Sequence, residues 1–218
     1  MDDLLISYSI VAFSSLFTLV NPIGFTAIFL SMVDGMNRSE KQKIAIKGVM
    51  TACIVLVIFS LIGRLIFSFF GITIDAFKIV GGILFFRSGL NLLESKISRT
   101  RSTPMEIKEA VDKEEIAFTP IGIPMIAGPG AITSVMILSA EATTFPYRII
   151  LLSVIFITMI LTLLFSYLGE KFTTYIGTTG MRIIQRIMGL ILMVIAVQFI
   201  IDGLTPIVIN WISMANHL

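Results

Sequence analysis

Histidine and cysteine are almost absent from this sequence. One cysteine (Cys53) and one histidine (His217) occur among its 218 residues. A disulfide within the chain or a cysteine metal cluster needs more than one cysteine. A histidine-ligated zinc site or a nucleophile–histidine–acid triad needs a histidine inside the fold. His217 is the penultimate residue, where we expect a tail. We therefore predict neither an enzyme nor a bound metal or other cofactor.

Charged residues are also scarce. They make up 14% of the chain, whereas 56% is hydrophobic and the mean hydropathy is +0.98. The charges cluster, and the apolar runs between them approach the roughly 20 residues that a helix needs to cross about 30 Å of hydrocarbon. The short alternating segments of a transmembrane β-barrel are not seen. The acidic start, Met1-Asp2-Asp3, is unlike a signal peptide, so we expect a retained first helix. The composition predicts an all-α membrane protein.

The apolar runs predict six transmembrane helices. Residues 94–116 form the long hydrophilic stretch between the third and fourth helices, and Thr103-Pro104-Met105-Glu106 within it has the pattern of a short helix start. Ser39-Glu40-Lys41-Gln42 resembles a capping box at the start of the second helix. The six helices are expected at about residues 4–32, 44–70, 74–93, 119–140, 149–168 and 181–201.

Lysine and arginine are distributed unevenly over the loops. Cytoplasmic loops carry an excess of these residues. If the N-terminus lies outside, the loops on the inner side hold nearly all of them, and the outer loops hold little beyond Arg148. We therefore expect a multi-pass protein of the cell (inner) membrane, with both termini external and the 94–116 loop cytoplasmic. The residues expected inside are Arg38, Lys41, Lys43, Lys47, Lys96, Arg99, Arg101, Lys108, Lys113, Lys171 and Arg182.

The two halves of the chain resemble each other. A shift of 107 residues relates Pro22 to Pro129 and Thr26 to Thr133. Shifts of 106 and 108 relate two further stretches, which are 59–63 with 165–169 and 78–84 with 186–192. Three helices per half is an odd number, so the second half must enter the membrane from the opposite side. The sequence predicts two inverted three-helix repeats, 1–93 and 117–218, joined by the 94–116 loop.

The first and fourth helices carry helix breakers at matching positions. These are Asn21-Pro22-Ile23-Gly24 and Ala127-Gly128-Pro129-Gly130-Ala131. One such break is ordinarily a structural kink, but a matched pair in inverted halves favours a transport site near the midplane. The helix starts at Gly24 and Gly130 would offer free N–H groups for a carboxylate, and the freed carbonyls would suit an ammonium group or a cation. The expected ligand is a small zwitterionic solute.

Other intramembrane polar residues have more ordinary interpretations. Asp75 and Lys78 are spaced for an ion pair at the outer interface. Arg87 either extends toward the inner interface or pairs with Glu94. Asn91, Gln198 and Asp202 are candidate polar lining, whereas Gly81, Gly82, Gly89 and Gly189 suggest close helix packing.

Two segments resemble the signatures of a known family. Leu19-Val20-Asn21-Pro22-Ile23-Gly24 and Pro124-Met125-Ile126-Ala127-Gly128-Pro129-Gly130-Ala131-Ile132-Thr133 are similar to those of the MarC family of integral membrane proteins. The first departs from the usual pattern, with Phe25 and Ala27 where an asparagine and a second proline are usual. The resemblance implies transport or export of small neutral amino acids such as alanine and glycine. It assigns a substrate site to Asn21, Pro22, Gly24, Gly128, Pro129, Gly130 and Thr133, and the internal repeat adds Thr26.

Two classes of function follow from these observations. The first is a secondary transporter working by alternating access, for which a proton or sodium ion, substrate exchange and facilitated diffusion all fit the residues. The second is a non-transporting membrane scaffold or sensor that acts through its cytoplasmic loop. The expected partners are the lipid bilayer, the solute and a coupling ion. Homo-oligomerisation is open, and no nucleic acid is expected.

Overall fold

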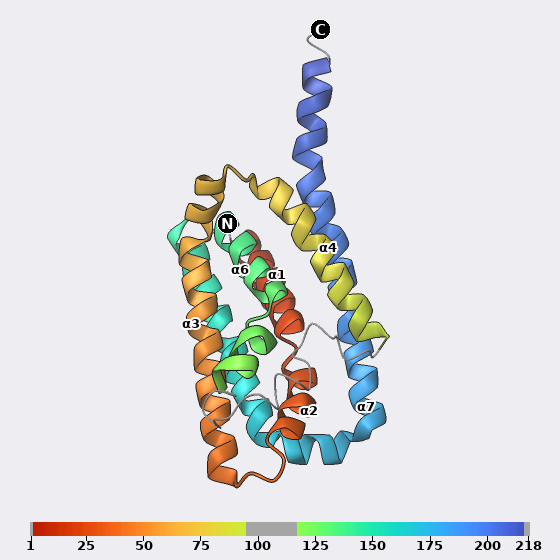
Figure 1. The fold of residues 1–218 in the computed structure, drawn as a ribbon. Helices are drawn as coiled ribbons and strands as arrows, with labels where there is room; N and C mark the ends of the chain where they lie inside the picture. The colour runs from red at the N-terminus through yellow and green to blue at the C-terminus, as the bar shows by residue number, and fades with distance from the viewer. Residues whose placement is uncertain (1, 95–116, 216–218) are drawn as a thin grey trace.

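The computed structural model of the chain describes residues 2–94 and 117–215. Every regular element in these two ranges is helical (Figure 1). The short helix start predicted at 103–106 and the tail residue His217 lie outside the described residues. The elements are α1 (Asp2–Val20), α2 (Pro22–Met32), α3 (Arg38–Phe70), α4 (Ile74–Leu93), the π-helix η1 (Ala117–Ile126), α6 (Pro129–Glu141) and α7 (Phe145–Ala215).

Five segments are long and apolar enough to cross a membrane. They are Asp3–Leu30, Arg38–Gly63, Ile74–Leu93, Phe145–Gly169 and Thr179–Ala215. The last two belong to α7, which Gly177 divides because its φ of 70° and ψ of 170° are not helical. We call residues 145–176 α7a and residues 178–215 α7b. The remaining expected helix, 119–140, is instead two short pieces, η1 and α6, of 10 and 13 residues. Its prolines and glycines interrupt the helical hydrogen bonds.

Local side-chain chemistry sets where α3 begins. The Asn37 side chain accepts a hydrogen bond from the Glu40 N–H at 2.9 Å, and the Glu40 carboxylate accepts from the Asn37 N–H at 3.2 Å. This is a capping box, and it satisfies two N–H groups that no helical carbonyl can reach. The sequence prediction placed the cap at Ser39, which is wrong by two residues, because Asn37 occupies the cap position and Ser39 lies within the helix.

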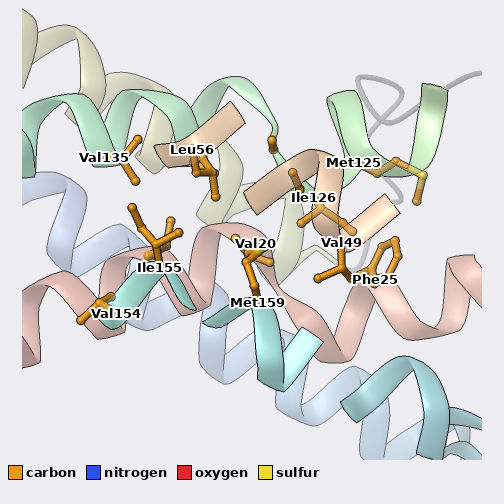
Figure 2. Close-up of a cluster of buried hydrophobic side chains, with 14 of the residues drawn as sticks. Val20, Phe25, Val49, Leu56, Met125, Ile126, Val135, Val154, Ile155 and Met159 are labelled. Carbon is orange, nitrogen blue, oxygen red and sulfur yellow. The ribbon is translucent and has the colours of Figure 1, made fainter. Parts of the chain in front are cut away.

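The main core lies between α1, α3, α6 and α7a. Val20, Leu56, Val135 and Ile155 come from these four helices and are fully buried together (Figure 2). Many side chains on the outer surface are also apolar, and Phe69 is 81% exposed. A soluble protein seldom leaves so much apolar surface exposed, whereas a lipid-facing surface has this character.

A second packing unit joins α4 to α7b through glycine. A Cβ built on Gly82 would lie 2.7 Å from the carbonyl oxygen of Ala196, and one on Gly89 would lie 2.7 Å from that of Gly189. The two helices run side by side in Figure 1. Close packing through Gly82, Gly89 and Gly189 is therefore confirmed, because backbone atoms occupy the space that a side chain would need.

Candidate functional site

The first break is a single residue with a left-handed backbone. Asn21 has φ 50° and ψ 64°, and among the described residues it is the one non-glycine with a positive φ. Its N–H still donates to the Phe17 carbonyl at 2.8 Å, and its side-chain oxygen accepts from the Gly24 N–H at 3.1 Å. The prediction that the Gly24 N–H is free is wrong, because Asn21 caps it. The helix resumes at Pro22, whose nitrogen has no hydrogen to donate.

The residues after Asn21 are packed tightly around it. A Cβ on Gly24 would lie 2.3 Å from the Asn21 side-chain nitrogen, so only glycine leaves room for this cap. The Thr26 hydroxyl donates to the Pro22 carbonyl at 2.7 Å, and Thr26 is fully buried. Its methyl group faces α7a, where a Cβ on Gly169 would lie 2.5 Å away.

The second break is uncapped. The N-cap residue Gly128 makes no side-chain hydrogen bond, and α6 begins at Pro129. The Ile132 N–H reaches the Gly128 carbonyl at 3.0 Å, so the N–H groups of Gly130 and Ala131 lie in the first turn, before regular helical bonding begins. Pro129 is exposed and Gly130 half-buried. The sequence predicted a helix start at Gly130, and the structure has it one residue earlier, at Pro129.

The two breaks adjoin each other. A Cβ built on Gly130 would lie 2.9 Å from the Leu19 side chain, two residues before Asn21. Thr133 is buried, and its methyl group faces α4, where a Cβ on Gly81 would lie 3.0 Å away. The structure therefore brings the breaks together, whereas the methyl groups of Thr26 and Thr133 face different helices.

The buried polar side chains of the described residues are all uncharged. They come from α1, the first break, α2, α3, α6 and α7a, and none from α4 or α7b. Polar groups thus gather around the two broken helices, and the α4–α7b unit is apolar inside. Within the described residues, no group of three histidine, cysteine, aspartate or glutamate residues could hold a metal ion. The set is Ser15, Thr18, Asn21, Thr26, Ser60, Thr133, Ser134, Thr158, Thr162 and Ser166.

Four of these side chains have an atom without a hydrogen-bond partner. They are the hydroxyls of Ser15, Ser134 and Thr158 and the amide nitrogen of Asn21. Buried polar atoms normally have a partner, and an exception calls for water, a ligand or strain to account for it. The sequence prediction missed the three hydroxyls. Ser15 and Ser134 could have been found from the sequence, because each lies within two helical turns of a predicted break, whereas no sequence feature marks Thr158.

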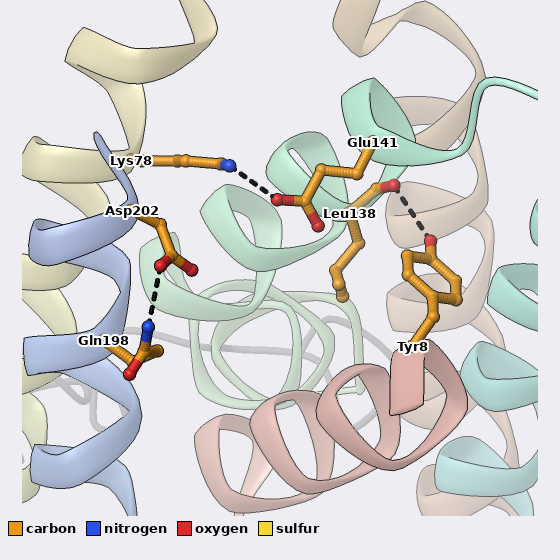
Figure 3. A network of polar contacts seen from close by, with 6 residues as sticks. All are labelled: Tyr8, Lys78, Leu138, Glu141, Gln198 and Asp202. Carbon is orange, nitrogen blue, oxygen red and sulfur yellow. Dashed lines mark hydrogen bonds and ion pairs between the residues drawn. The ribbon is translucent and has the colours of Figure 1, made fainter. Parts of the chain in front are cut away.

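Polar contacts lie at the C-terminal end of α6, which is the end farther from the break (Figure 3). Lys78 of α4 forms an ion pair with Glu141 at 2.7 Å, and the Tyr8 hydroxyl donates to the Leu138 carbonyl at 2.9 Å. The predicted pairing of Lys78 with Asp75 is wrong, because α6 ends beside α4 and presents Glu141 to the lysine.

Gln198, Asp202 and Arg87 lie on α4 and α7b and do not belong to the set of buried polar side chains. The Gln198 amide donates to Asp202 at 2.7 Å within α7b, and this contact is exposed (Figure 3). Arg87 is also exposed, on α4. These side chains do not belong to the polar group around the two breaks.

Comparison with known proteins gives a consistent family. A model described as MarC family integral membrane protein matches residues 6–208. UPF0056 membrane protein MJ1677 of Methanocaldococcus jannaschii is 38% identical over 203 residues, which cover 91% of this chain and 97% of the relative. UPF0056 membrane protein YvbG of Bacillus subtilis is 39% identical, with 92% and 96% covered. UPF0056 membrane protein YhcE of Escherichia coli is 31% identical, with 89% and 91% covered. No solved structure matches the chain.

Proposed function

The chain belongs to the MarC family of integral membrane proteins, and on that basis we propose that it is a secondary transporter or exporter of small neutral amino acids such as alanine and glycine. The observation that carries this proposal is the approach of the two helix breaks at Leu19 and Gly130, together with the unpaired, buried amide nitrogen of Asn21. Breaks in membrane helices are the usual place for a transporter's solute.

The chemistry around the breaks suits a small zwitterion. The first-turn N–H groups at Gly130 and Ala131 and the Asn21 amide are donors, and a helix start is electropositive, so they favour a carboxylate. Hydroxyl oxygens nearby accept hydrogen bonds, as an ammonium group requires. The buried polar set includes no charged side chain. A solute with net charge would be unmatched there, whereas one with both signs would be accommodated.

We also propose that the helices form two inverted three-helix repeats, with η1 and α6 as the fourth, broken span. A pair of contacts supports this arrangement. A Cβ on Gly169 would lie 3.3 Å from Leu30, and one on Gly63 would lie 3.3 Å from the Met136 backbone. A shift of 106 residues relates Gly63 to Gly169 and Leu30 to Met136. Each broken helix thus packs in the same way against an unbroken helix of the other half.

Alternating access follows from that architecture. The broken helices pack against α3 and α7a, and the α4–α7b unit is held together by backbone contacts at glycines. We propose that these two groups of helices move relative to each other around the breaks. The start of α1 and the end of α7 lie at one end of the molecule and the turn between α2 and α3 at the other (Figure 1). We propose that the first end is external, that the 94–116 loop is cytoplasmic and that the membrane is the cell (inner) membrane.

Measurements of amino acid flux test the transporter proposal. Purified protein in proteoliposomes is expected to transport labelled alanine and glycine with saturable kinetics, and parallel runs with proton and sodium gradients identify the coupling ion. The double variant Gly128→Leu/Gly130→Leu is expected to lose flux, while Phe69→Leu on the exposed surface keeps it. If no small amino acid shows saturable flux, the transporter assignment is wrong. A cellular function that survives loss of the breaks but not of residues 103–115 would favour the scaffold alternative.

A further inference from the structure

Two serines share the interface between α1 and α6. These helices are antiparallel neighbours (Figure 1). Two contacts mark their interface. Leu19 lies against Gly130, and the Tyr8 hydroxyl donates to the Leu138 carbonyl (Figure 3). Residues four apart on a helix share one face. Ser15 precedes Leu19 by four residues, and Ser134 lies four residues from both Gly130 and Leu138. Both serines therefore lie between the two contacts, at the same level of the interface.

Neither serine hydroxyl has a hydrogen-bond partner among the described residues, although both side chains are fully buried. A serine in a helix commonly satisfies its hydroxyl on the carbonyl four residues earlier. Ser9 does so with the Leu5 carbonyl at 2.7 Å, and Ser166 does so with the Thr162 carbonyl at 2.8 Å. Ser15 and Ser134 depart from this behaviour at one place in the fold, so their hydroxyls are left available to a third group.

We infer that Ser15 and Ser134 form a solute-binding pair, one helical turn from the breaks, that accepts the ammonium group of the bound amino acid. The identity of the solute rests on the proposed function. The donors at the breaks take the carboxylate, and the two serine oxygens provide acceptors for the ammonium group. One helical turn rises about 5.4 Å. A site with its donors at the break and its acceptors one turn away can therefore engage the carboxylate and the ammonium group of one amino acid at the same time.

Cysteine reactivity tests the pair without requiring transport. The chain has a single cysteine, so Cys53→Ala gives a cysteine-free background. Ser15→Cys and Ser134→Cys are then labelled with the small cationic thiol reagent 2-aminoethyl methanethiosulfonate, with and without alanine. Ala12→Cys and Val135→Cys are matched controls on the same two helices, both fully buried in the apolar core. The serine positions are expected to react about tenfold faster than the controls, and alanine is expected to slow them severalfold.

The outcomes separate this inference from the transport proposal. Equal labelling of serine and control positions overturns the inference, as does fast labelling that neither alanine nor glycine slows. Protection by alanine without flux in proteoliposomes supports the binding pair and removes the transport assignment. Flux by the unmodified protein without protection removes the pair and leaves the transport assignment in place.

Removing each hydroxyl gives a second readout. Ser15→Ala and Ser134→Ala are expected to raise the KM for alanine about tenfold, the value of one hydrogen bond to a charged group, with little change in maximal flux. Ser14→Ala is the matched control, because the Ser14 hydroxyl already donates to the Ile10 carbonyl at 2.6 Å. A merely structural role would lower melting temperature and folded yield and leave KM unchanged, and that result overturns the inference. If the alanine variants fold poorly, Ser15→Thr and Ser134→Thr are measured in their place. They keep a hydroxyl, so they are expected to keep a KM for alanine close to that of the parent protein.

Discussion

Leu19 of α1 lies against Gly130 of α6, close enough that a Cβ on the glycine would stand 2.9 Å from the leucine's terminal methyl carbon. The two residues are 111 positions apart in the chain, and each lies two residues or fewer from a helix break. Their contact joins the two broken helices close to the point where each is interrupted. The size of the residue at position 130 should therefore control access to the site.

Substitution of Gly130 is expected to act in proportion to side-chain size. In Gly130→Ala the new methyl group meets the far end of the flexible Leu19 side chain, which can turn away, so we expect near-normal folding and flux within about threefold of the parent. In Gly130→Leu the side chain fills the space between the breaks, and flux should fall at least about tenfold. Proteoliposome uptake of labelled alanine measures both. Equal flux in the two variants would contradict the prediction that the size of residue 130, next to Leu19, controls access to the site.

Gly169 and Thr26 are expected to be energetically coupled. The Thr26 hydroxyl is held by the Pro22 carbonyl, so its methyl group cannot rotate away from a new Cβ at position 169. Gly169→Ala should destabilise the protein by about 1–3 kcal/mol through overpacking. Thr26→Ser keeps the hydroxyl and removes the methyl, and should recover about 1 kcal/mol of that loss. Thermal unfolding of both single variants and the double variant in detergent measures the coupling, and additive effects would show that it does not exist.

Asn21 should separate folding from transport. Asn21→Ala loses the helix cap and keeps a Cβ in a left-handed conformation, so we expect a stability loss of about 2 kcal/mol. Asn21→Gly suits the left-handed backbone and should cost less, about 0.5 kcal/mol. Both variants lack the buried amide nitrogen, and both should lose alanine flux. Melting temperatures and uptake are measured on the same preparations, and full flux in Asn21→Gly would exclude the amide from the site.

The ion pair of Lys78 and Glu141 should respond to charge exchange. The lysine side chain is 14% exposed and the glutamate 32%, so solvent screens the pair only in part. Lys78→Glu places two carboxylates together and should cost about 1 kcal/mol, and the exchanged variant Lys78→Glu/Glu141→Lys should recover most of it. Asp75→Lys is the control for the sequence-based pairing. A recovery of Lys78→Glu by Asp75→Lys in place of Glu141→Lys would show that the partner is misassigned.

Much of the fold could be predicted from local sequence. Five of the apolar segments appear as helices long enough to cross a membrane, and the breaks occur at Asn21 and Gly128 as their glycines and prolines indicate. The predicted helix start at Ser39 was two residues late, because asparagine two positions earlier is as good a cap and has Glu40 at the required spacing. These features depend on residues within one or two turns of one another, which is why a single sequence reveals them.

The candidate site depended on contacts that no local pattern encodes. The sequence by itself determined that the chain is a helical membrane protein with two matched helix breaks, because hydropathy and proline chemistry act over short distances. Only the tertiary structure decided that Lys78 pairs with Glu141. It also brought Leu19 to Gly130 and left the Ser15 and Ser134 hydroxyls without partners. The physical reason is that these relationships depend on how helices that are distant in the sequence pack and rotate against each other.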